Sequence, residues 1–433
     1  SRLDDIDLLP HRLALALELD REGPEDGRLG VGLGRGRALE PHGGDVVAVA
    51  KAEELQGRAR ADRVDLGPEP LAVADRRDKA CGRGLVRGLG LRGGLDRVRV
   101  DLGVRYETAE QTVTPLDLFN DGILPIAPIK NDYLLPAATV TWNFAEDFQL
   151  RLHGSKTIAR PQFRELAPQR FVDIDTDRIF FGNPFLQDSE FKNAEARLEY
   201  YFGSGERATA AAFYKDIENP IETVGVIATG SRTLQGNFAN APKAQIYGAE
   251  VEVLKNFSLS NLGGWFDTKQ LVLSANYTYS KSKLKVSGDD EVLVYQSATS
   301  GPLAIPAINL FKDGSRMVGQ SDHIVNVQFG IEDTEKTQAM TLLLRYASDR
   351  VTLRGPLVGA NADPDVIEEP GLEVDFVLRD TWPIWGQEFD VKFAARNILG
   401  EEYKETQAFE DFTAQRNVYD RGTSFSFSVG TTF

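Results

Sequence analysis

The sequence predicts an all-β protein whose fold is an antiparallel transmembrane β-barrel. Two observations predict it: apolar and polar residues alternate within many short segments, and the connections between these segments alternate between long and short. The alternation is clearest at the end of the chain, where one face carries Phe425, Phe427, Val429, Thr431 and Phe433. Small polar residues occupy the other face. A pleated strand separates such residues onto opposite faces, and a membrane barrel turns the apolar face to lipid and the polar face to its lumen.

Twelve segments in the later part of the chain share this alternation. Their lengths are close to the roughly 9–11 residues that a tilted strand needs to cross a bilayer. In chain order, the predicted strands are 98–106, 134–144, 148–156, 194–202, 207–215, 247–253, 271–279, 325–331, 340–346, 372–378, 389–395 and 425–433.

The connections predict how the strands are oriented. Those after the even-numbered strands are short, whereas those after the odd-numbered strands run to roughly 25–40 residues, as in outer-membrane barrels with short periplasmic turns and long outer loops. We therefore expect an outer-membrane location with the carboxyl terminus in the periplasm. The alternative is a soluble antiparallel sandwich, whose connections would usually be about 2–6 residues long.

Composition divides the chain into residues 1–96 and 97–433. All 24 Phe, 12 Tyr and 4 Trp residues lie after position 105. A globular core depends on such large side chains, so we expect residues 1–96 to form no core. Two interpretations of this Gly/Arg-rich segment remain open: an aberrant translation product of GC-rich DNA, or a disordered region.

The sequence contains no pattern typical of an enzyme or of a resident metal. Cys81 is the single cysteine, which excludes a disulfide framework and a thiolate cluster. In the predicted barrel, His153 and His323 are the only histidines, and neither has a GxSxG nucleophile motif beside it. We therefore expect no catalysis, no cofactor and no bound metal.

Several motifs then occur in a fixed order along the predicted barrel. They are Ser-Lys-Thr-Ile-Ala-Arg-Pro-Gln-Phe-Arg-Glu-Leu-Ala-Pro at 155–168, Gly-Asn-Pro-Phe-Leu at 182–186, Phe-Tyr-Lys-Asp-Ile-Glu-Asn-Pro-Ile at 213–221 and Arg-Asn-Ile-Leu-Gly at 396–400. Together with the aromatic residue Phe433, this series resembles the carboxyl-terminal part of the barrel of TonB-dependent outer-membrane receptors. The resemblance covers about 97–433.

The resemblance implies a fold and a function. The family barrel has 22 strands around an amino-terminal plug, so the twelve strands here would be its second half. Such receptors actively take up a scarce solute, namely a ferric siderophore, cobalamin or an oligosaccharide. Because neither the plug nor the TonB-pairing segment is recognisable, we expect a fragment of such a receptor. The alternative is a stand-alone 12-stranded outer-membrane pore, hydrolase or anchor.

The resemblance also implies partners. These are outer-membrane lipid and lipopolysaccharide, a small-molecule ligand, and the barrel-assembly machinery, for which Phe433 resembles the assembly signal. The TonB complex would be a partner only through the absent amino-terminal part. No nucleic-acid partner is expected.

Four arginines in one long connection are the candidate ligand-binding residues. Arg160, Arg164, Arg170 and Arg178 follow the third predicted strand, where a basic patch could attract an anionic ferric chelate. The alternative is structural, since Arg160 and Arg164 belong to the recurring family motif. In that case they would serve loop or plug packing.

Overall fold

The computed structural model describes residues 73–79, 83–84, 97–114, 126, 128–174, 176–227, 234–295, 302–358 and 361–431. No helix within these ranges is long and apolar enough to cross a membrane. All the described residues lie in one compact unit, Pro70–Phe433.

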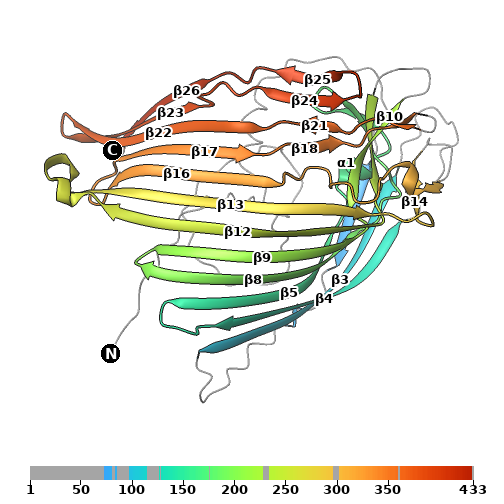
Figure 1. Ribbon diagram of the computed structural model, residues 1–433, viewed down its shortest axis with the longest axis horizontal. Helices are drawn as coiled ribbons and strands as arrows, with labels where there is room; N and C mark the ends of the chain where they lie inside the picture. The colour runs from blue at the N-terminus through green and yellow to red at the C-terminus, as the bar shows by residue number, and fades with distance from the viewer. Residues whose placement is uncertain are drawn as a thin grey trace, which may run out of the picture. The chain divides into compact units, whose positions relative to one another are not determined.

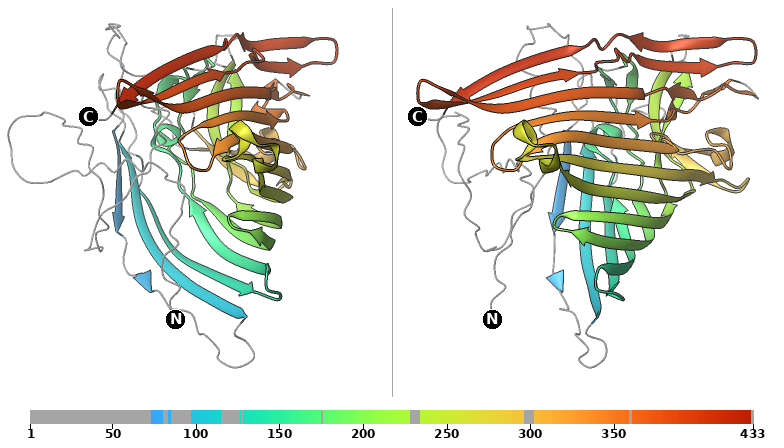
Figure 2. Two further views of the ribbon diagram at one scale, coloured as in Figure 1. Left: turned by 90° about the vertical axis from the view of Figure 1, so that its left-hand side faces the viewer. Right: turned by 60° about the vertical axis from the view of Figure 1, so that its left-hand side comes forward.

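One large antiparallel sheet contains a strand for each of the twelve predicted segments, so the predicted strands are confirmed. Neighbouring strands lie side by side in Figure 1, and the sheet is strongly curved in Figure 2. The twelve strands, in their order across the sheet, are β3 (Val98–Thr114), β4 (Ile129–Trp142), β5 (Phe148–Ala159), β8 (Ser189–Gly203), β9 (Glu206–Glu218), β12 (Lys243–Ser258), β13 (Lys269–Lys285), β16 (His323–Asp333), β17 (Ala339–Ala347), β22 (Gly371–Ile384), β23 (Gln387–Arg396) and β26 (Ser424–Thr431).

Two further strands pair with β3 and were not predicted. They are β1 (Val73–Lys79) and β2 (Arg83–Gly84), both antiparallel to β3. They lie within the segment 1–96, for which we predicted no core. The remainder of 1–96 lies outside the described residues, so that prediction is not tested.

Several strands are longer than predicted at the end that carries the long connections. Strand β3 continues past 106 to Thr114, and β13 continues past 279 to Lys285. In these extensions one face is buried by loops, with Gln111 and Val113 on β3 and Leu284 on β13 almost inaccessible. The lipid-type alternation ends before the strands do, which is why the sequence pattern predicted shorter strands.

The predicted alternation of short turns and long connections is confirmed. Figure 1 shows that most of the additional strands gather at one end of the large sheet. The short connections at the other end include two 3-10 turns, η1 (Ser260–Leu262) and η2 (Gly264–Phe266). In the two-residue turn between β22 and β23, Trp385 and Gly386 both have positive φ, as a primed turn requires.

The apolar face of the large sheet is exposed over much of its area. On β26, Phe425 and Phe427 are 70% and 65% exposed. Soluble monomers rarely leave such contiguous apolar surface in water, and a lipid-facing barrel wall accounts for it. The fold class predicted from the sequence is therefore correct.

The long connections form small sheets of their own. One contains residues from two connections, in the order β10-β11-β7-β6, and another contains residues from two later ones, in the order β18-β21-β24-β25. The loop elements are α1 (Phe163–Leu166), β6 (Arg170–Val172), β7 (Ile179–Phe181), β10 (Ile221–Ile227), β11 (Leu234–Asn240), β14 (Glu291–Val294), β15 (Leu303–Pro306), η3 (Ala307–Asn309), β18 (Arg350–Leu353), β19 (Leu357–Val358), β20 (Asn361–Ala362), β21 (Val366–Glu368), β24 (Tyr403–Ala408) and β25 (Thr413–Tyr419).

The hydrophobic core of the described residues lies among these loops. One cluster combines Leu284 of β13 with Val292 of β14 and Phe311. A second combines Val113 of β3 with Leu166 of α1 and other buried residues of two connections. The loops are therefore a packed layer at one end of the sheet.

Candidate ligand-binding site

The 182–186 motif is the junction of three long connections. Asn183 is fully buried, and its Nδ2 donates to the carbonyl oxygens of Phe238 (2.9 Å) and Leu293 (3.0 Å). Its backbone N–H donates to the carbonyl oxygen of Glu165 at 2.6 Å. An asparagine amide has two donor hydrogens and can serve both carbonyls at once. The motif therefore joins the β5–β8, β9–β12 and β13–β16 connections.

Residue 182, which precedes Asn183 in the motif, must be glycine for steric reasons. A Cβ atom at Gly182 would lie 2.1 Å from the carbonyl oxygen of Ala167, which is an atomic overlap with backbone. The close approach brings the 182–186 motif onto the end of α1, where Leu166 and Leu186 are buried together. The residues that carry the family resemblance thus build the frame of the loop layer.

Two of the four predicted arginines are held in internal ion pairs. Arg160 contacts Glu107 of β3 at 2.9 Å. Arg178 contacts Glu405 of β24 at 2.9 Å, and the two side chains are only 9% and 0% exposed. Each carboxylate neutralises its arginine, so these two side chains connect loop residues to strands. The structural alternative named Arg160 and Arg164, and of these two only Arg160 is held in such a pair.

The other two arginines are exposed. Arg164 lies on α1, and Arg170 at the start of β6 places its guanidinium carbon 5.0 Å from the centroid of the Phe181 ring. Both can meet a solute from outside the loop layer. The ligand-binding prediction therefore stays a prediction, and the geometry favours this pair over Arg160 and Arg178.

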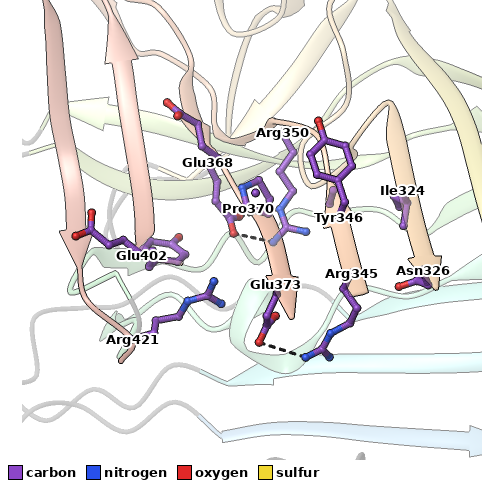
Figure 3. A pocket seen from close by; sticks show the side chains of 14 residues that line it. Ile324, Asn326, Arg345, Tyr346, Arg350, Glu368, Pro370, Glu373, Glu402 and Arg421 are labelled. Carbon is purple, nitrogen blue, oxygen red and sulfur yellow. Dashed lines mark hydrogen bonds and ion pairs between the residues drawn. The ribbon is translucent and has the colours of Figure 1, made fainter. Parts of the chain in front are cut away.

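A pocket that the sequence analysis did not identify opens beside the loop layer. Its volume is about 240 Å³. Figure 3 shows Arg350 pointing toward Glu368 and Arg345 toward Glu373. It is lined by Ile324, Asn326, Arg345, Tyr346, Ala347, Arg350, Glu368, Glu369, Pro370, Gly371, Glu373, Glu402, Tyr403 and Arg421.

Two arginines of this pocket are paired with carboxylates. Arg345 contacts Glu373 at 3.2 Å and Asp375 at 2.8 Å. Arg350 donates from Nε and Nη2 to both oxygens of Glu368, at 2.7 and 2.9 Å. This bidentate hydrogen bond raises the pKa of Arg350. These pairs give the pocket a rigid polar wall.

Arg421 and Glu402 supply the pocket's available charges. Arg421 donates only a long hydrogen bond, 3.4 Å, from Nε to the carbonyl oxygen of Glu401. Within the described part of the chain, no ion pair involves Arg421 or Glu402. One cation and one anion on the same wall can orient a polar solute by complementary contacts.

The polar face of the large sheet carries a second, wider cavity. Its volume is about 520 Å³, and its lining includes Arg99, Arg151 and Glu195. His153 also lines it, with ring nitrogens 2.9 Å from Thr139 Oγ1 and 3.1 Å from Ser155 Oγ. Over the described ranges, no three His, Cys, Asp or Glu side chains are grouped so that they could hold a metal ion.

The pocket residues had a partial signal in the sequence. Arg345 and Glu373 alternate with apolar residues on predicted strands, which already assigned them to the polar face. Nothing in the sequence showed that these positions are direct cross-strand partners. Arg350, Glu402 and Arg421 lie in connections, whose arrangement depends on tertiary packing.

The chain is similar to several known outer-membrane and transport proteins. Over 157 residues the chain is 28% identical to the iron-regulated outer membrane virulence protein of Vibrio cholerae serotype O1, a match that covers 35% of this chain and 22% of the relative. The solved FrpB iron transporter of Neisseria meningitidis (F3-3 variant) is 13% identical, with a TM-score of 0.46 over 83% of this chain and 44% of that chain. The solved copper transporter OprC is 14% identical, with a TM-score of 0.48 over 78% and 46%. The chain thus spans less than half of these proteins.

A family model gives the most extensive match. The model described as "TonB dependent receptor-like, beta-barrel" matches residues 89–398, which is more than half of the chain. The matched range contains eleven of the twelve predicted strands and the motifs at 155–168, 182–186 and 213–221. We conclude that this chain belongs to the TonB-dependent receptor-like β-barrel family of outer-membrane proteins.

Proposed function

We propose that this chain supplies barrel strands to an outer-membrane receptor for the active uptake of a scarce solute. In this proposal the long connections face the medium and the carboxyl terminus faces the periplasm. Energy would come from the TonB complex through a plug and TonB-pairing segment that we do not recognise in residues 1–433. The barrel-assembly machinery and outer-membrane lipid would be its further partners.

The observation that carries this proposal is the pocket beside the loop layer. It lies where the polar face of the barrel strands meets packed connections, and its lining includes Arg421 and Glu402, which have no ion-pair partner among the described residues. A solute arriving from the loop side would meet these groups before the wider cavity on the polar face. A capture site above a lumen is what uptake requires, so we propose transport and no catalysis.

Among the candidate solutes we propose a ferric siderophore ahead of cobalamin or an oligosaccharide. The related Vibrio cholerae protein is named as iron-regulated. The exposed Arg164 and Arg170 could attract an anionic chelate, and long-range attraction of this kind raises association rates. Arg160 and Arg178 would act indirectly, by holding the loop layer in place through Glu107 and Glu405.

The test is surface binding and accumulation in cells that lack their own receptors. The chain is expressed in the outer membrane, and labelled ferric siderophores, cobalamin and maltodextrins are supplied in turn. We expect saturable binding of a ferric siderophore that Arg164→Ala/Arg170→Ala weakens by about tenfold at low salt. The matched control is Arg207→Ala, at an arginine paired with Glu252 near the opposite end of the sheet.

The same experiment separates the alternative functions. Accumulation that is equal with and without a working TonB complex would indicate a stand-alone pore and contradict the receptor proposal. Binding of none of the three solute classes would also contradict it.

A further inference from the structure

The pocket beside the loop layer is lined by more acidic than basic side chains. Three arginines and four glutamates contribute to its lining. Two of the arginines, Arg345 and Arg350, are held by carboxylates. Glu369 is likewise paired, at 2.8 Å from Lys404. Among the described residues, Arg421 is therefore the one lining cation without an ion-pair partner, and its surroundings are acidic.

Arg421 and Glu402 are the unpaired charges of the pocket, and they lie on adjoining segments. Tyr403 of β24 is the cross-strand partner of Tyr419 of β25, so Glu402 and Arg421 lie just beyond the last pair of these two strands. Figure 3 shows both at the same side of the pocket. Within the described part of the chain they form no ion pair with each other. Each therefore keeps a charge that a solute can meet.

One buried side chain fixes the spacing of these two segments. Asn397 Nδ2 donates to the carbonyl oxygens of Glu401 (3.0 Å) and Gly422 (3.1 Å). Its Oδ1 accepts from the backbone N–H of Glu401 at 2.8 Å. The residues next to Glu402 and Arg421 are thus tied to the same amide group. The two charges extend from a fixed backbone frame, which lowers the ordering cost when a solute binds between them.

A guanidinium and a carboxylate that do not neutralise each other suit a ligand that carries both charges. A guanidinium binds a carboxylate with two parallel hydrogen bonds, and a carboxylate accepts from an ammonium group. A purely anionic ligand would gain Arg421 but would be repelled by the excess of glutamates, and a purely cationic ligand would leave Arg421 uncompensated. A ligand with an ammonium beside a carboxylate compensates both side chains at once.

The volume of the pocket limits how much of a solute can enter. At about 240 Å³ it is smaller than the roughly 300–1,000 Å³ of sites that enclose a drug-sized ligand. It therefore takes a small molecule or one arm of a larger one. Ile324 and Pro370 add a short apolar stretch to the lining, which suits the methylene groups next to a charged head.

We propose that the pocket binds an amino-acid group, in which an ammonium and a carboxylate are attached to the same carbon atom. Arg421 binds the carboxylate and Glu402 binds the ammonium. The group belongs either to a small free amino acid or to one arm of a larger chelate, and both have the same chemistry in the pocket. This inference rests on the proposed function, which assigns solute capture to this pocket, and it names the class of solute that the pocket selects.

The test measures equilibrium binding to the purified full chain in non-ionic detergent micelles. The probe is Nε-acetyl-lysine, which has a free amino-acid group and a neutral side chain. Two analogues each lack one charge: the Nα-acetylated derivative is an anion, and the derivative with a carboxamide in place of the carboxylate is a cation. We expect each analogue to bind about tenfold to a hundredfold more weakly than the probe, because each loses one charge-assisted contact.

Two variants separate recognition from a structural effect. Arg421→Gln and Glu402→Gln should each weaken binding of the probe by about tenfold. Glu402→Gln should also strengthen binding of the anionic analogue, because it removes a repelling charge. Arg421→Gln should strengthen binding of the cationic analogue for the same reason. Damage to the fold would instead lower all three affinities together.

The matched controls remove one cation and one anion that do not line the pocket. Arg316 and Asp349 form an exposed ion pair at 2.8 Å, and neither belongs to the lining. Arg316→Gln and Asp349→Asn should each change the affinities by less than about twofold. Heat-modifiable migration on a gel verifies that every variant is folded. Because Arg421 and Glu402 are both exposed, we expect their variants to fold.

A second measurement distinguishes the two sources of the amino-acid group. A ferric trihydroxamate coupled to the side chain of lysine leaves the α-ammonium and the carboxylate free. Tighter binding of this conjugate than of Nε-acetyl-lysine would identify the arm of a chelate. Equal or weaker binding would identify a small free amino acid, and either result supports the amino-acid site.

The proposal would be overturned by the absence of saturable Nε-acetyl-lysine binding, or by equal binding of either analogue. A parallel loss of all three affinities in the pocket variants, or an equal loss in the controls, would also overturn it. The measurement needs no TonB complex or energy source. A negative result therefore leaves the uptake proposal standing, since that proposal is tested in cells and through Arg164 and Arg170. Binding of the probe without uptake in cells would contradict transport alone.

Discussion

Arg354 and Glu222 form a buried ion pair that joins two long connections of the barrel. Arg354 donates from Nη2 (2.7 Å) and Nε (3.2 Å) to the same oxygen of Glu222, although 132 residues separate them in the sequence. The side chains are 3% and 1% exposed. Glu222 also accepts from the backbone N–H of Val318, and Arg354 also contacts Asp365. The pair therefore links the β9–β12, β13–β16 and β17–β22 connections.

We predict that Arg354→Gln will open the loop layer. The substitution leaves the Glu222 carboxylate buried without its cation, which typically costs about 3–5 kcal/mol. The double variant Glu222→Gln/Arg354→Gln should recover part of this loss, because it removes the uncompensated charge. Hydrogen exchange of the amides in 221–226 and 351–354 measures the local free energy of opening.

The control for that prediction is an exposed ion pair close by. Arg316 and Asp349 are in contact at 2.8 Å, but their side chains are 31% and 50% exposed. Asp349→Asn should change amide protection by less than about 1 kcal/mol. Equal effects of Arg354→Gln and Asp349→Asn would contradict a special role for the buried pair.

We predict that Gly182→Ala will disrupt the junction of three connections. The new methyl group would overlap the carbonyl oxygen of Ala167, so the 182–186 motif must move and Asn183 would lose its hydrogen bonds to two other connections. Limited proteolysis of the folded barrel should show faster cleavage in the long connections. Gly103→Ala is the matched control, since nothing lies within 4 Å of a Cβ at Gly103. Equal cleavage rates in the two variants would refute this prediction.

We predict that Asn397→Ala will destabilise the junction of β22, β23 and β26 by about 2–4 kcal/mol. Asn397 is buried with φ of 52°, and its side chain bonds the backbone of Glu401 and Gly422. Its own backbone N–H donates to Asp375, the carboxylate that also holds Arg345 of the pocket.

Asn397→Gly separates the two contributions. Glycine accepts a positive φ but cannot make the side-chain hydrogen bonds, so we expect it to be less damaging than alanine by about 1 kcal/mol. The free energy of unfolding in urea measures both variants. A glycine variant as unstable as the alanine variant would show that backbone conformation contributes nothing.

We predict an alkaline loss of stability that depends on Tyr403. Burial, reinforced by Glu405 and Glu368, raises the pKa of Tyr403 well above its ordinary value. The unfolded chain releases this proton near pH 10 and the folded chain retains it, so stability falls above that pH by about 1.4 kcal/mol per pH unit. Tyr403→Phe should remove this contribution from urea unfolding compared at pH 9 and 11.5.

Tyr346→Phe is the matched control for the alkaline effect. Tyr346 lines the same pocket but is 41% exposed. If Tyr346→Phe flattened the pH dependence as much as Tyr403→Phe, the burial argument would be wrong.

We predict that Phe433→Ser will lower the amount of barrel in the outer membrane. Phe433 lies outside the described residues, but in the sequence it continues the alternation of Phe425, Phe427 and Val429. It therefore resembles the aromatic signal that the assembly machinery reads. Quantitative gels of heat-modifiable barrel measure the effect, and Thr432→Ser, at the neighbouring polar position of the sequence, is the control. Unchanged levels in Phe433→Ser would count against the assembly role.

The twelve barrel strands could be predicted because their signal is local. Alternation with period two follows from backbone geometry and from which face meets lipid, so it is visible within each short segment, as at Leu271 to Tyr279. The alternation of long and short connections could also be predicted, because each connection length follows from the spacing between two successive strands in the sequence. The extension of β13 to Lys285 was missed because its outward positions there are lysines rather than apolar residues, while loops cover its inner face.

The candidate site could be predicted only in part. The four arginines were identified from their clustering along the chain, yet Arg178 is paired with Glu405, which lies 227 residues away. No local pattern indicates such a partner, because charge alone does not specify which loop packs against which. The same holds for Asn183, which belongs to the 182–186 motif identified from the sequence but whose partners at Phe238 and Leu293 could not be predicted.

The sequence by itself therefore determined the strands, their lipid-facing sides and the family, since these follow from residue-by-residue alternation and short motifs. Only the tertiary structure decided which loop charges are neutralised and which remain available. Arg160 and Arg178 are paired, whereas Arg421 has no carboxylate partner among the described residues. The physical reason is that pairing depends on distances between segments far apart in the chain, and these distances exist only after the long connections have packed together.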